Sequence, residues 1–354
     1  MQNKILISTG GTGGHVIPAT ILQEHLSEKN DVIISTDRRG YKYLNEEIHK
    51  IEIIDTPKLN NIFLLPFNFL IIIFLTIKSF FLLKKKNINL LFSTGGYMSI
   101  PLILAAKLRK LKIYLLEPNL VLGRSNKFFV NSCEKIFCYS DNIKNFPEIF
   151  RDKIKVINPL VRKEFYKNTK TSINIDKFIV LIIGGSQGAS IFDRNLKNSV
   201  VHISKKFSIK IIQQTSKKNI ENLRKFYFEN KVECEIFNYD KNLITKILNS
   251  DLCITRAGSS TLAELSILNI PFIAIPLASS KDNHQFENAN FYKNKECCWI
   301  IDQSVFEKNI EQTLEGIFKN KIEYNKKIEN LKKLNYQNTW INVNQKLIDT
   351  INEN

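Results

Sequence analysis

Short apolar runs recur along the first half of the chain, each separated from the next by a longer stretch of mixed polarity. Runs of this kind, bounded by turn residues, are typical of buried strands in parallel sheets. Their alternation with helical stretches predicts βαβ units. The strands expected in the first half are residues 4–8, 31–35, 51–54, 89–93, 113–116, 135–139 and 155–157.

The second half repeats the pattern. A strongly apolar run at residues 178–183 opens it, and from Val305 onward the pattern becomes helical. The last segment, residues 340–351, is amphipathic and predicts a helix with one buried face. The other strands expected here are residues 209–212, 233–236, 251–255 and 271–275.

Because both halves show the same organisation, we expect an α/β chain of two domains, each built on an open sheet. The segment at residues 158–166 is a candidate linker between them. We place the first domain at residues 1–162 and the second at residues 163–335. A C-terminal helix at residues 336–354 follows, and packing back on the first domain is one arrangement open to it.

The first expected strand runs into a glycine-rich turn at residues 10–18, and a stretch suited to a helix follows. Glycines leave backbone N–H groups uncovered, and a helix N-terminus attracts anions. Ligands of open α/β sheets bind at such strand ends, so we expect phosphate or sugar groups to bind here. The glycines of this turn are Gly10, Gly11, Gly13 and Gly14. Comparable turns lie at residues 94–99, 184–189 and 256–261.

These turns match neither of two common nucleotide-binding patterns. The G-x-x-x-x-G-K-[ST] pattern of a P-loop is absent from the sequence, and no turn carries the dinucleotide fingerprint with its acidic residue in place. The sequence therefore disfavours a P-loop kinase and a nicotinamide-dependent enzyme.

His15 lies where the first glycine turn enters the expected helix. It is the side chain in this turn that can accept or donate a proton near neutral pH. Two interpretations stay open: a group that takes part in chemistry, or an exposed histidine in an ordinary strand-to-helix turn.

Residues 62–77 carry no charge, and the apolar character continues until Lys84, Lys85 and Lys86. The length approaches the ~20 residues that span a bilayer. A helix that only covers a sheet should show one polar side, and lysines beside an apolar face can meet anionic head groups. We therefore favour a helix lying on the membrane surface, from Ile62 to Lys86, over a buried core helix and over a transmembrane helix.

Composition adds two constraints. The chain has 51 Lys and Arg against 34 Asp and Glu, a formal net charge of +17, which favours anionic partners. Much of this excess fits a general bias towards lysine, and no aromatic RNA-binding motif or zinc-finger spacing is present, so nucleic acid is disfavoured. The cysteines are scattered without a C-x-x-C pair, which predicts reduced thiols that fill the core. They are Cys133, Cys138, Cys234, Cys253, Cys297 and Cys298.

Six motifs in one order along the chain together resemble the MurG family of bacterial undecaprenyl-diphospho-muramoylpentapeptide N-acetylglucosaminyltransferases. Each motif alone is weak, but their order at domain-scale spacing is specific. They are GGTGGHVIP from Gly10, TGGYMS from Thr94, EPN from Glu117, GGSQGA from Gly184, RAGSSTLAE from Arg256 and DNHQ from Asp282.

The resemblance implies a GT-B fold, in which two Rossmann-like, doubly wound domains face each other across a cleft. It implies an inverting glycosyltransferase that moves N-acetylglucosamine from UDP-N-acetylglucosamine to the muramoyl 4-hydroxyl of lipid I, giving lipid II in peptidoglycan synthesis. It implies no cofactor and no metal, because helix N-termini and a cation neutralise the leaving diphosphate. The implied partners are UDP-N-acetylglucosamine, lipid I and an anionic membrane surface, and the implied location is peripheral, on the cytoplasmic face of the cell membrane.

The resemblance also implies roles for single residues. His15 is the candidate general base for the acceptor hydroxyl or, instead, a contact to a donor phosphate. Arg162 would meet the diphosphate, and Glu264 would accept hydrogen bonds from the ribose hydroxyls. Gln285 or its neighbour His284 would touch the donor sugar. The other residues expected to bind UDP-N-acetylglucosamine are Thr12, Gly13, Gly14, Asn119, Ser186, Tyr239, Gly258, Ser259, Ser260, Thr261, Leu262 and Ala263.

Two other function classes remain open at this point. The chain is also compatible with another GT-B enzyme, such as a glycolipid glycosyltransferase or a UDP-N-acetylglucosamine epimerase, although an epimerase has no use for the apolar segment. The basic charge is compatible with a non-catalytic module that binds a nucleotide sugar or a membrane.

Overall fold

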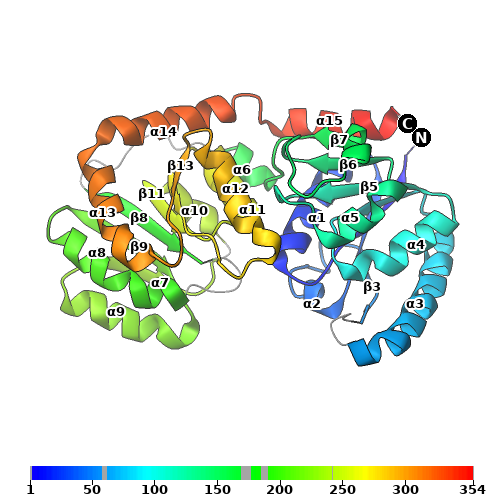
Figure 1. Ribbon diagram of the computed structural model, residues 1–354, viewed down its shortest axis with the longest axis horizontal. Coiled ribbons are helices and arrows are strands. Elements are labelled where there is room, and N and C mark those ends of the chain that lie inside the picture. Colours follow the sequence, from blue (N-terminus) through cyan, green and yellow to red (C-terminus); the bar gives the residue numbers. More distant parts are fainter. Residues whose placement is uncertain (1, 58–61, 169–176, 185–189, 241, 354) are drawn as a thin grey trace. The chain divides into compact units, whose positions relative to one another are not determined.

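The computed structural model describes residues 2–57, 62–168, 177–184, 190–240 and 242–353. The chain divides into two compact units (Figure 1). The first unit comprises Met1–Lys163 and Trp340–Asn354, and the second comprises Glu164–Thr339. The chain therefore leaves the first unit after Lys163 and re-enters it at Trp340.

The described part of the first unit is built on seven parallel strands in the order β3-β2-β1-β4-β5-β6-β7. The first strand lies inside the sheet, between β2 and β4, and its apolar side chains are buried on both faces. The strands are β1 (Lys4–Ser8), β2 (Asp31–Thr36), β3 (Ile51–Ile53), β4 (Leu90–Ser93), β5 (Lys112–Glu117), β6 (Lys135–Cys138) and β7 (Ile154–Val156).

Helices cover this sheet, and one of them comes from the far end of the sequence. The last helix places Val343, Leu347, Ile348 and Ile351 in the same hydrophobic core as β1 and α1. This spacing forms one apolar stripe on a helix, which explains the amphipathic pattern seen in the sequence. The helices are α1 (Gly13–Leu26), α2 (Arg38–Tyr41), α3 (Leu65–Lys85), α4 (Ile100–Leu108), α5 (Arg124–Phe129) and α15 (Trp340–Asn352).

The second unit repeats the architecture, with six parallel strands among its described residues in the order β10-β9-β8-β11-β12-β13. The strands are β8 (Phe178–Ile183), β9 (Ile209–Gln214), β10 (Glu233–Phe237), β11 (Leu252–Thr255), β12 (Phe272–Ala274) and β13 (Cys298–Ile300). The helices are α6 (Lys163–Tyr166), α7 (Ser190–Asn195), α8 (Lys197–Ser204), α9 (Ile220–Glu229), α10 (Leu243–Leu248), α11 (Ser259–Ile267), α12 (His284–Lys293), α13 (Phe306–Lys319) and α14 (Lys321–Leu334).

The strands expected from the sequence are confirmed, with β1 and β8 matching residue for residue. The edge strand β13 was not among them, because a strand of 3 residues is too short to show a strand pattern. The six cysteines are free thiols as expected. Burial raises the pKa of Cys133 and of Cys297 to about 11, which keeps these thiols protonated and unreactive.

Helix α3 turns its more polar side inward. It packs along α4 at the periphery of the first unit (Figure 1), and by length and composition it is apolar enough to cross a membrane. The stripe that it buries comprises Asn68, Ile72, Leu75, Thr76, Ser79 and Leu83. The large apolar side chains that it exposes are Leu65, Phe67, Phe69, Leu70, Ile73, Phe74, Ile77 and Phe81. A helix that only serves a soluble core shows the opposite distribution, so the interpretation of α3 as a wholly buried core helix is wrong.

A single carboxylate joins both places where the chain passes between the units. Glu28, just after the end of α1, accepts hydrogen bonds from Nζ of Lys163 (3.0 Å) and Nε1 of Trp340 (2.8 Å). It also accepts one from Nδ2 of Asn344 in α15 (2.7 Å). The exit point and the re-entry point of the chain are thus both anchored at the C-terminal end of α1.

His25 lies beneath this junction. Its ring stacks on that of Trp340, with centroids 3.5 Å apart and planes 13° from parallel. The side chain is fully buried, and among the described residues neither ring nitrogen has a hydrogen-bond partner. Burial lowers the pKa of His25 to about 3, because the nearby carboxylate of Glu28 offsets only part of the cost of burying an imidazolium.

The buried His25 predicts a specific loss of stability in acid. The unfolded chain protonates this histidine near its ordinary pKa, whereas the folded chain does so only near pH 3, so the unfolded state binds the extra proton in between. Stability should therefore fall as the pH drops below 6.5, by about 2–3 kcal/mol at about pH 4.5. In urea titrations at several pH values, His25→Phe, which keeps a ring for Trp340, should flatten this dependence. The surface variant His202→Phe should not, and equal pH dependence in all three proteins would contradict the assignment.

Candidate functional site

The first unit gathers its candidate residues where β1 and β4 end. The two strands are parallel neighbours with Ser8 opposite Ser93. The turns that follow them therefore start side by side, and Oγ1 of Thr94 donates a hydrogen bond to Oγ1 of Thr9 (2.8 Å). The register of the sheet thus brings together two glycine turns that lie far apart in the sequence.

The first turn leads directly into α1. Gly10 and Gly11 have φ of +153° and +82°, and Thr12 is the N-cap residue. The N–H groups of Gly13 and Gly14 belong to the first turn of the helix, before its regular hydrogen bonds begin. Thr12 and Gly14 are exposed, so this end of α1 can accept an anionic or polar group.

His15 lies in the same helical turn, and its ring is oriented by the second glycine turn. Its Nδ1 is 2.8 Å from the carbonyl oxygen of Thr94. Because a carbonyl oxygen only accepts hydrogen bonds, Nδ1 must carry the proton, and the neutral ring presents an unprotonated Nε2. His15 is therefore held in the tautomer that a general base requires.

The second turn is shaped by Gly95 and Gly96, with φ of +85° and +84°. Met98, in the short helix η2 (Tyr97–Ser99), packs against both turns. A Cβ on Gly11 would lie 2.8 Å from its Cε, and a Cβ on Gly96 would overlap its Sδ. A side chain at Gly11 or at Gly96 would therefore displace Met98.

A buried carboxylate holds Asn119, one of the expected sugar-binding residues. Glu117, at the end of β5, accepts hydrogen bonds from the backbone N–H and Nδ2 of Asn119 (both 3.1 Å). It also accepts from the N–H of Gly123 (2.8 Å) and Nδ2 of Asn126 (3.0 Å). Burial raises the pKa of Glu117, and the hydrogen bonds and the nearby His15 oppose this rise.

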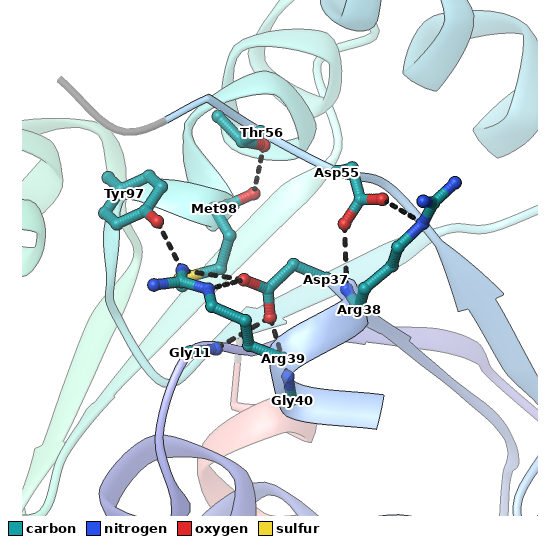
Figure 2. Close-up of polar contacts among 9 residues, drawn as sticks. All are labelled: Gly11, Asp37, Arg38, Arg39, Gly40, Asp55, Thr56, Tyr97 and Met98. Carbon is teal, nitrogen blue, oxygen red and sulfur yellow. Dashed lines mark hydrogen bonds and ion pairs between the residues drawn. The ribbon is translucent and has the colours of Figure 1, made fainter. Parts of the chain in front are cut away.

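An acidic residue also follows β2, next to the first glycine turn. Oδ1 of Asp37 accepts the N–H of Gly11 (2.8 Å) and that of Gly40 (2.9 Å), as Figure 2 shows. Oδ2 accepts Nε and Nη2 of Arg39 (2.9 and 2.7 Å). In dinucleotide-binding folds an acidic residue near this strand binds a ribose, but here Asp37 is occupied by its own glycine turn.

The second unit has a comparable turn between β11 and α11. Gly258 is the N-cap residue, and the first hydrogen bond of the helix runs from the N–H of Leu262 to the carbonyl of Gly258 (3.0 Å). The N–H groups of the three residues between them precede this ladder and face the start of the helix. Glu264 lies one turn further along and is buried.

The loop that contains the last motif closes around the same turn. Nδ2 of the buried Asn288 donates to the carbonyl of Ala257 (3.2 Å), and Oε1 of Gln285 accepts the N–H of Leu277 (2.9 Å). Nη1 of Arg256 donates to the carbonyl oxygens of Ile275 and Pro276 (3.0 and 3.3 Å). These bonds join the ends of β11, β12 and α12.

The structure places the expected site residues in two groups, one in each unit. The first unit holds Thr12, Gly13, Gly14, His15, Asn119 and Arg162, of which the first four adjoin the paired glycine turns. The second unit holds Tyr239, Gly258, Ser259, Ser260, Thr261, Leu262, Ala263, Glu264, His284 and Gln285. The side chain of Tyr239 is exposed, and Ser186 lies outside the described residues. Within the described ranges, no cluster of three or more His, Cys, Asp or Glu side chains is arranged to hold a metal ion.

Comparison with known proteins identifies the family. Residues 5–138 match the glycosyltransferase family 28 N-terminal domain, and residues 179–339 match its C-terminal domain. A UDP-N-acetylglucosamine–N-acetylmuramyl-(pentapeptide) pyrophosphoryl-undecaprenol N-acetylglucosamine transferase of Pelagibacter ubique is 49% identical, and the match covers 100% of both chains. The enzyme of the same name from Rickettsia felis is 34% identical over 86% of this chain and 87% of its own. The chain belongs to this transferase family.

Solved structures show the same fold. The crystal structure of Acinetobacter baumannii MurG has a TM-score of 0.78 at 20% identity, with 100% of both chains covered. A UDP-GlcNAc 2-epimerase from Neisseria meningitidis has a TM-score of 0.68 at 14% identity, covering 99% of this chain and 100% of its own. The expected family, GT-B fold class and glycosyltransferase class are confirmed. The epimerases share the fold, but membership of the transferase family decides against that alternative.

Some residues of this site were not singled out from the sequence. Asp37 and Arg39 follow a strand that neighbours the glycine-turn strand, and this position was the available signal. Glu117 and Arg256 lie inside recognised motifs, but a motif does not say which of its side chains are buried. The contact of Met98 with both turns depends on the sheet register, which no local pattern encodes.

The crowding around Gly96 predicts that a single methyl group there disrupts the turn. Gly96→Ala should lower the free energy of unfolding by about 1–2 kcal/mol or more, because its φ is left-handed and Met98 must move. Gly316, exposed in the last turn of α13 with open space around it, is the matched control. Gly316→Ala should raise stability by about 0.5–1 kcal/mol. Urea unfolding measures both, and equal effects would contradict the strain at Gly96.

Proposed function

We propose that this chain transfers N-acetylglucosamine from UDP-N-acetylglucosamine to the muramoyl 4-hydroxyl of lipid I, giving lipid II, with His15 as the general base. Membership of the transferase family supports the reaction. The observation that carries the role of His15 is its hydrogen bond to the carbonyl of Thr94, because this bond leaves Nε2 ready to accept a proton.

The reaction follows from this tautomer. Nε2 of His15 takes the proton of the acceptor hydroxyl while its oxygen attacks the anomeric carbon of the donor sugar. The bond between that carbon and the diphosphate oxygen breaks, and UDP leaves with the electron pair. Attack from the face opposite the leaving group inverts the anomeric centre. A positioned base of this kind contributes about 100-fold or more to the rate.

The second unit supplies the chemistry that a nucleoside diphosphate requires. The start of α11 presents N–H groups and a positive helix end to phosphate oxygens. Glu264 projects from the same helix, where a carboxylate can accept two vicinal ribose hydroxyls. Asn288 and Gln285 fix the surrounding loops, so the leaving diphosphate would meet donors that are already oriented.

The remaining expected residues keep their assigned roles in this proposal. Asn119 orients a sugar, because Glu117 fixes its amide. Arg162 supplies a cation for the diphosphate, and His284 or Gln285 contacts the donor sugar. Tyr239 contributes through its backbone, which agrees with its exposed side chain.

Helix α3 supports attachment to the membrane that carries a lipid-linked acceptor. Its exposed face is rich in phenylalanine, and its polar side packs against α4. Because one side of α3 is buried in a unit built on a seven-stranded sheet, only the opposite face is free to meet lipid, and we infer that this face lies on the bilayer surface. Lys86 pairs with Glu52 (2.8 Å), which leaves Lys84 and Lys85 as the head-group contacts. The protein is then peripheral, on the cytoplasmic face of the cell membrane.

A transfer assay with labelled UDP-N-acetylglucosamine and a lipid I analogue tests the reaction. The wild type should form lipid II, and His15→Ala should lower kcat by about 100-fold or more while the KM for the donor changes little. His202→Ala, a surface histidine of the second unit, should behave as the wild type. Absence of transfer by the folded wild type would refute the function. A parallel change in kcat and donor affinity would instead make His15 a donor contact.

Flotation with vesicles tests the surface of α3. Binding to vesicles rich in phosphatidylglycerol should be lost when Phe67, Phe74 and Phe81 are all changed to Ser. Lys84→Ala and Lys85→Ala should each weaken it by about fivefold, an effect that salt removes. Phe228→Ser, which changes a still more exposed phenylalanine of the second unit, should change nothing. Undiminished flotation of the triple variant, or retention of the wild type after a carbonate wash, would contradict the surface attachment.

A further inference from the structure

We propose that Arg39 is a positioning residue for the transfer: it ties the second glycine turn to the first and so holds the carbonyl that orients His15. The inference rests on the proposed role of His15 as base. Arg39 lies on α2 and was not among the residues expected to act in the site. Figure 2 shows it between Asp37 and Tyr97.

The anchor of this arrangement is the carboxylate of Asp37. Its side chain is only 4% exposed, and both oxygens are occupied. One oxygen accepts the N–H groups of Gly11 and Gly40, and the other accepts both Nε and Nη2 of Arg39. Burial pushes the pKa of Asp37 up, but these donors outweigh it and hold the carboxyl below its usual range. The carboxylate of Asp37 is thus ionised and held in one orientation, and it is bonded to the first glycine turn.

Arg39 connects this carboxylate to the second turn. Its Nη2 also donates to the hydroxyl of Tyr97, and its guanidinium carbon lies 5.2 Å from the centre of the tyrosine ring. Tyr97 directly follows Gly95 and Gly96. The planar guanidinium is therefore held by Asp37 on one side and by Tyr97 on the other.

The second turn is attached at its start, where Oγ1 of Thr94 donates to Oγ1 of Thr9 (2.8 Å) and the N–H of Gly95 donates to Oγ of Ser93 (3.1 Å). Arg39 adds an attachment at its far end through Tyr97. Gly95 and Gly96 have no side chains to pack. Hydroxyl groups of Ser99 and Ser125 donate hydrogen bonds to the carbonyl of Gly96 (2.7 and 3.0 Å). Polar side-chain contact between the start of α2 and the second turn runs through Arg39 and Tyr97.

The second turn is in direct contact with the ring of His15. The carbonyl of Thr94, at the beginning of the second turn, accepts the proton on Nδ1 of His15 (2.8 Å). A Cβ on Gly96 would lie 3.8 Å from Cδ2 of the same ring. A shift of the second turn therefore moves the group that selects the tautomer of His15. Misplacement by about 1 Å can cost about 100-fold in rate.

Arg39 is 41% exposed, so a direct contact between its charge and an anionic part of the acceptor is the competing role. The two roles make different demands. A contact to an anion needs a positive charge, which lysine also supplies. The link from Asp37 to Tyr97 needs the planar guanidinium of arginine, because a lysine ammonium cannot bind Asp37 through two nitrogens and Tyr97 at the same time.

The decisive experiment measures Arg39→Met, Arg39→Lys and Tyr97→Phe, each alone and in the His15→Ala background. Each of the two Arg39 variants should lower kcat by about 10- to 100-fold with the KM for UDP-N-acetylglucosamine within about twofold of the wild type. Tyr97→Phe, which removes only a hydroxyl and preserves the fold, should show part of the loss. In the His15→Ala background all three should change kcat by less than about twofold, because the base that they position is gone.

Arg38 provides the matched control. It is the preceding residue on α2, its side chain is 85% exposed, and it pairs with Asp55 (2.7 Å). Arg38→Met should leave kcat unchanged. Recovery of activity in Arg39→Lys would overturn the proposal in favour of a charge contact, and a full loss on top of His15→Ala would show that Arg39 does not act through His15.

A second measurement separates this proposal from the proposed function. In the protein labelled with ¹⁵N-histidine, the ring nitrogens of His15 report the tautomer directly, and the His15→Ala spectrum assigns them. The wild type should show protonated Nδ1, and Arg39→Met should show a mixture of tautomers or exchange broadening. An unchanged His15 spectrum in Arg39→Met would refute the tie even if the wild type forms no lipid II, whereas failure of transfer alone would refute only the function.

Discussion

The parallel register of β1 and β4 is the constraint from which the first-unit site follows. Because Ser8 lies opposite Ser93, the turns after the two strands begin together, and their threonines are hydrogen-bonded. The other contacts of the site are made between residues close to these two turns. The Thr94 carbonyl reaches the His15 ring, Met98 fills the space that two glycine turns leave open, and Asp37 reaches back from β2 to bind Gly11. A slip of one residue between β1 and β4 would remove the contacts of Thr94 and Met98 with the first turn at once.

The fold was largely readable from the sequence, because parallel strands buried on both faces appear as apolar runs that need no tertiary information. β1 and β8 are such strands, and both were located residue for residue. β13 was not, since its place at the sheet edge depends on pairing with β12. The same division holds in the site. His15 and Glu264 could be named because their motifs are local, whereas Arg39 acquires its role from Asp37 and Tyr97, one close in sequence and the other 58 residues away.

Helix α3 shows why composition alone left three interpretations open. A nearly uncharged sequence does not say which side of a helix packs on protein. The structure shows that Asn68, Thr76 and Ser79 face inward, so the apolar excess lies outward. A large exposed apolar face next to lysines is costly in water and useful at a bilayer surface. The exposed apolar face of α3 belongs to the same unit as His15, so the candidate base and the surface suited to a bilayer are in one unit.

The two units are not independent pieces of the chain. Glu28 anchors both the residue at which the chain leaves the first unit and the residue at which it returns, and α15 completes the first core with Val343 and Leu347. During synthesis the ribosome delivers α15 last. The first unit, although most of it is made first, therefore cannot finish its core until the entire second unit has been translated. The first unit is therefore the first to be synthesised and the last to be completed.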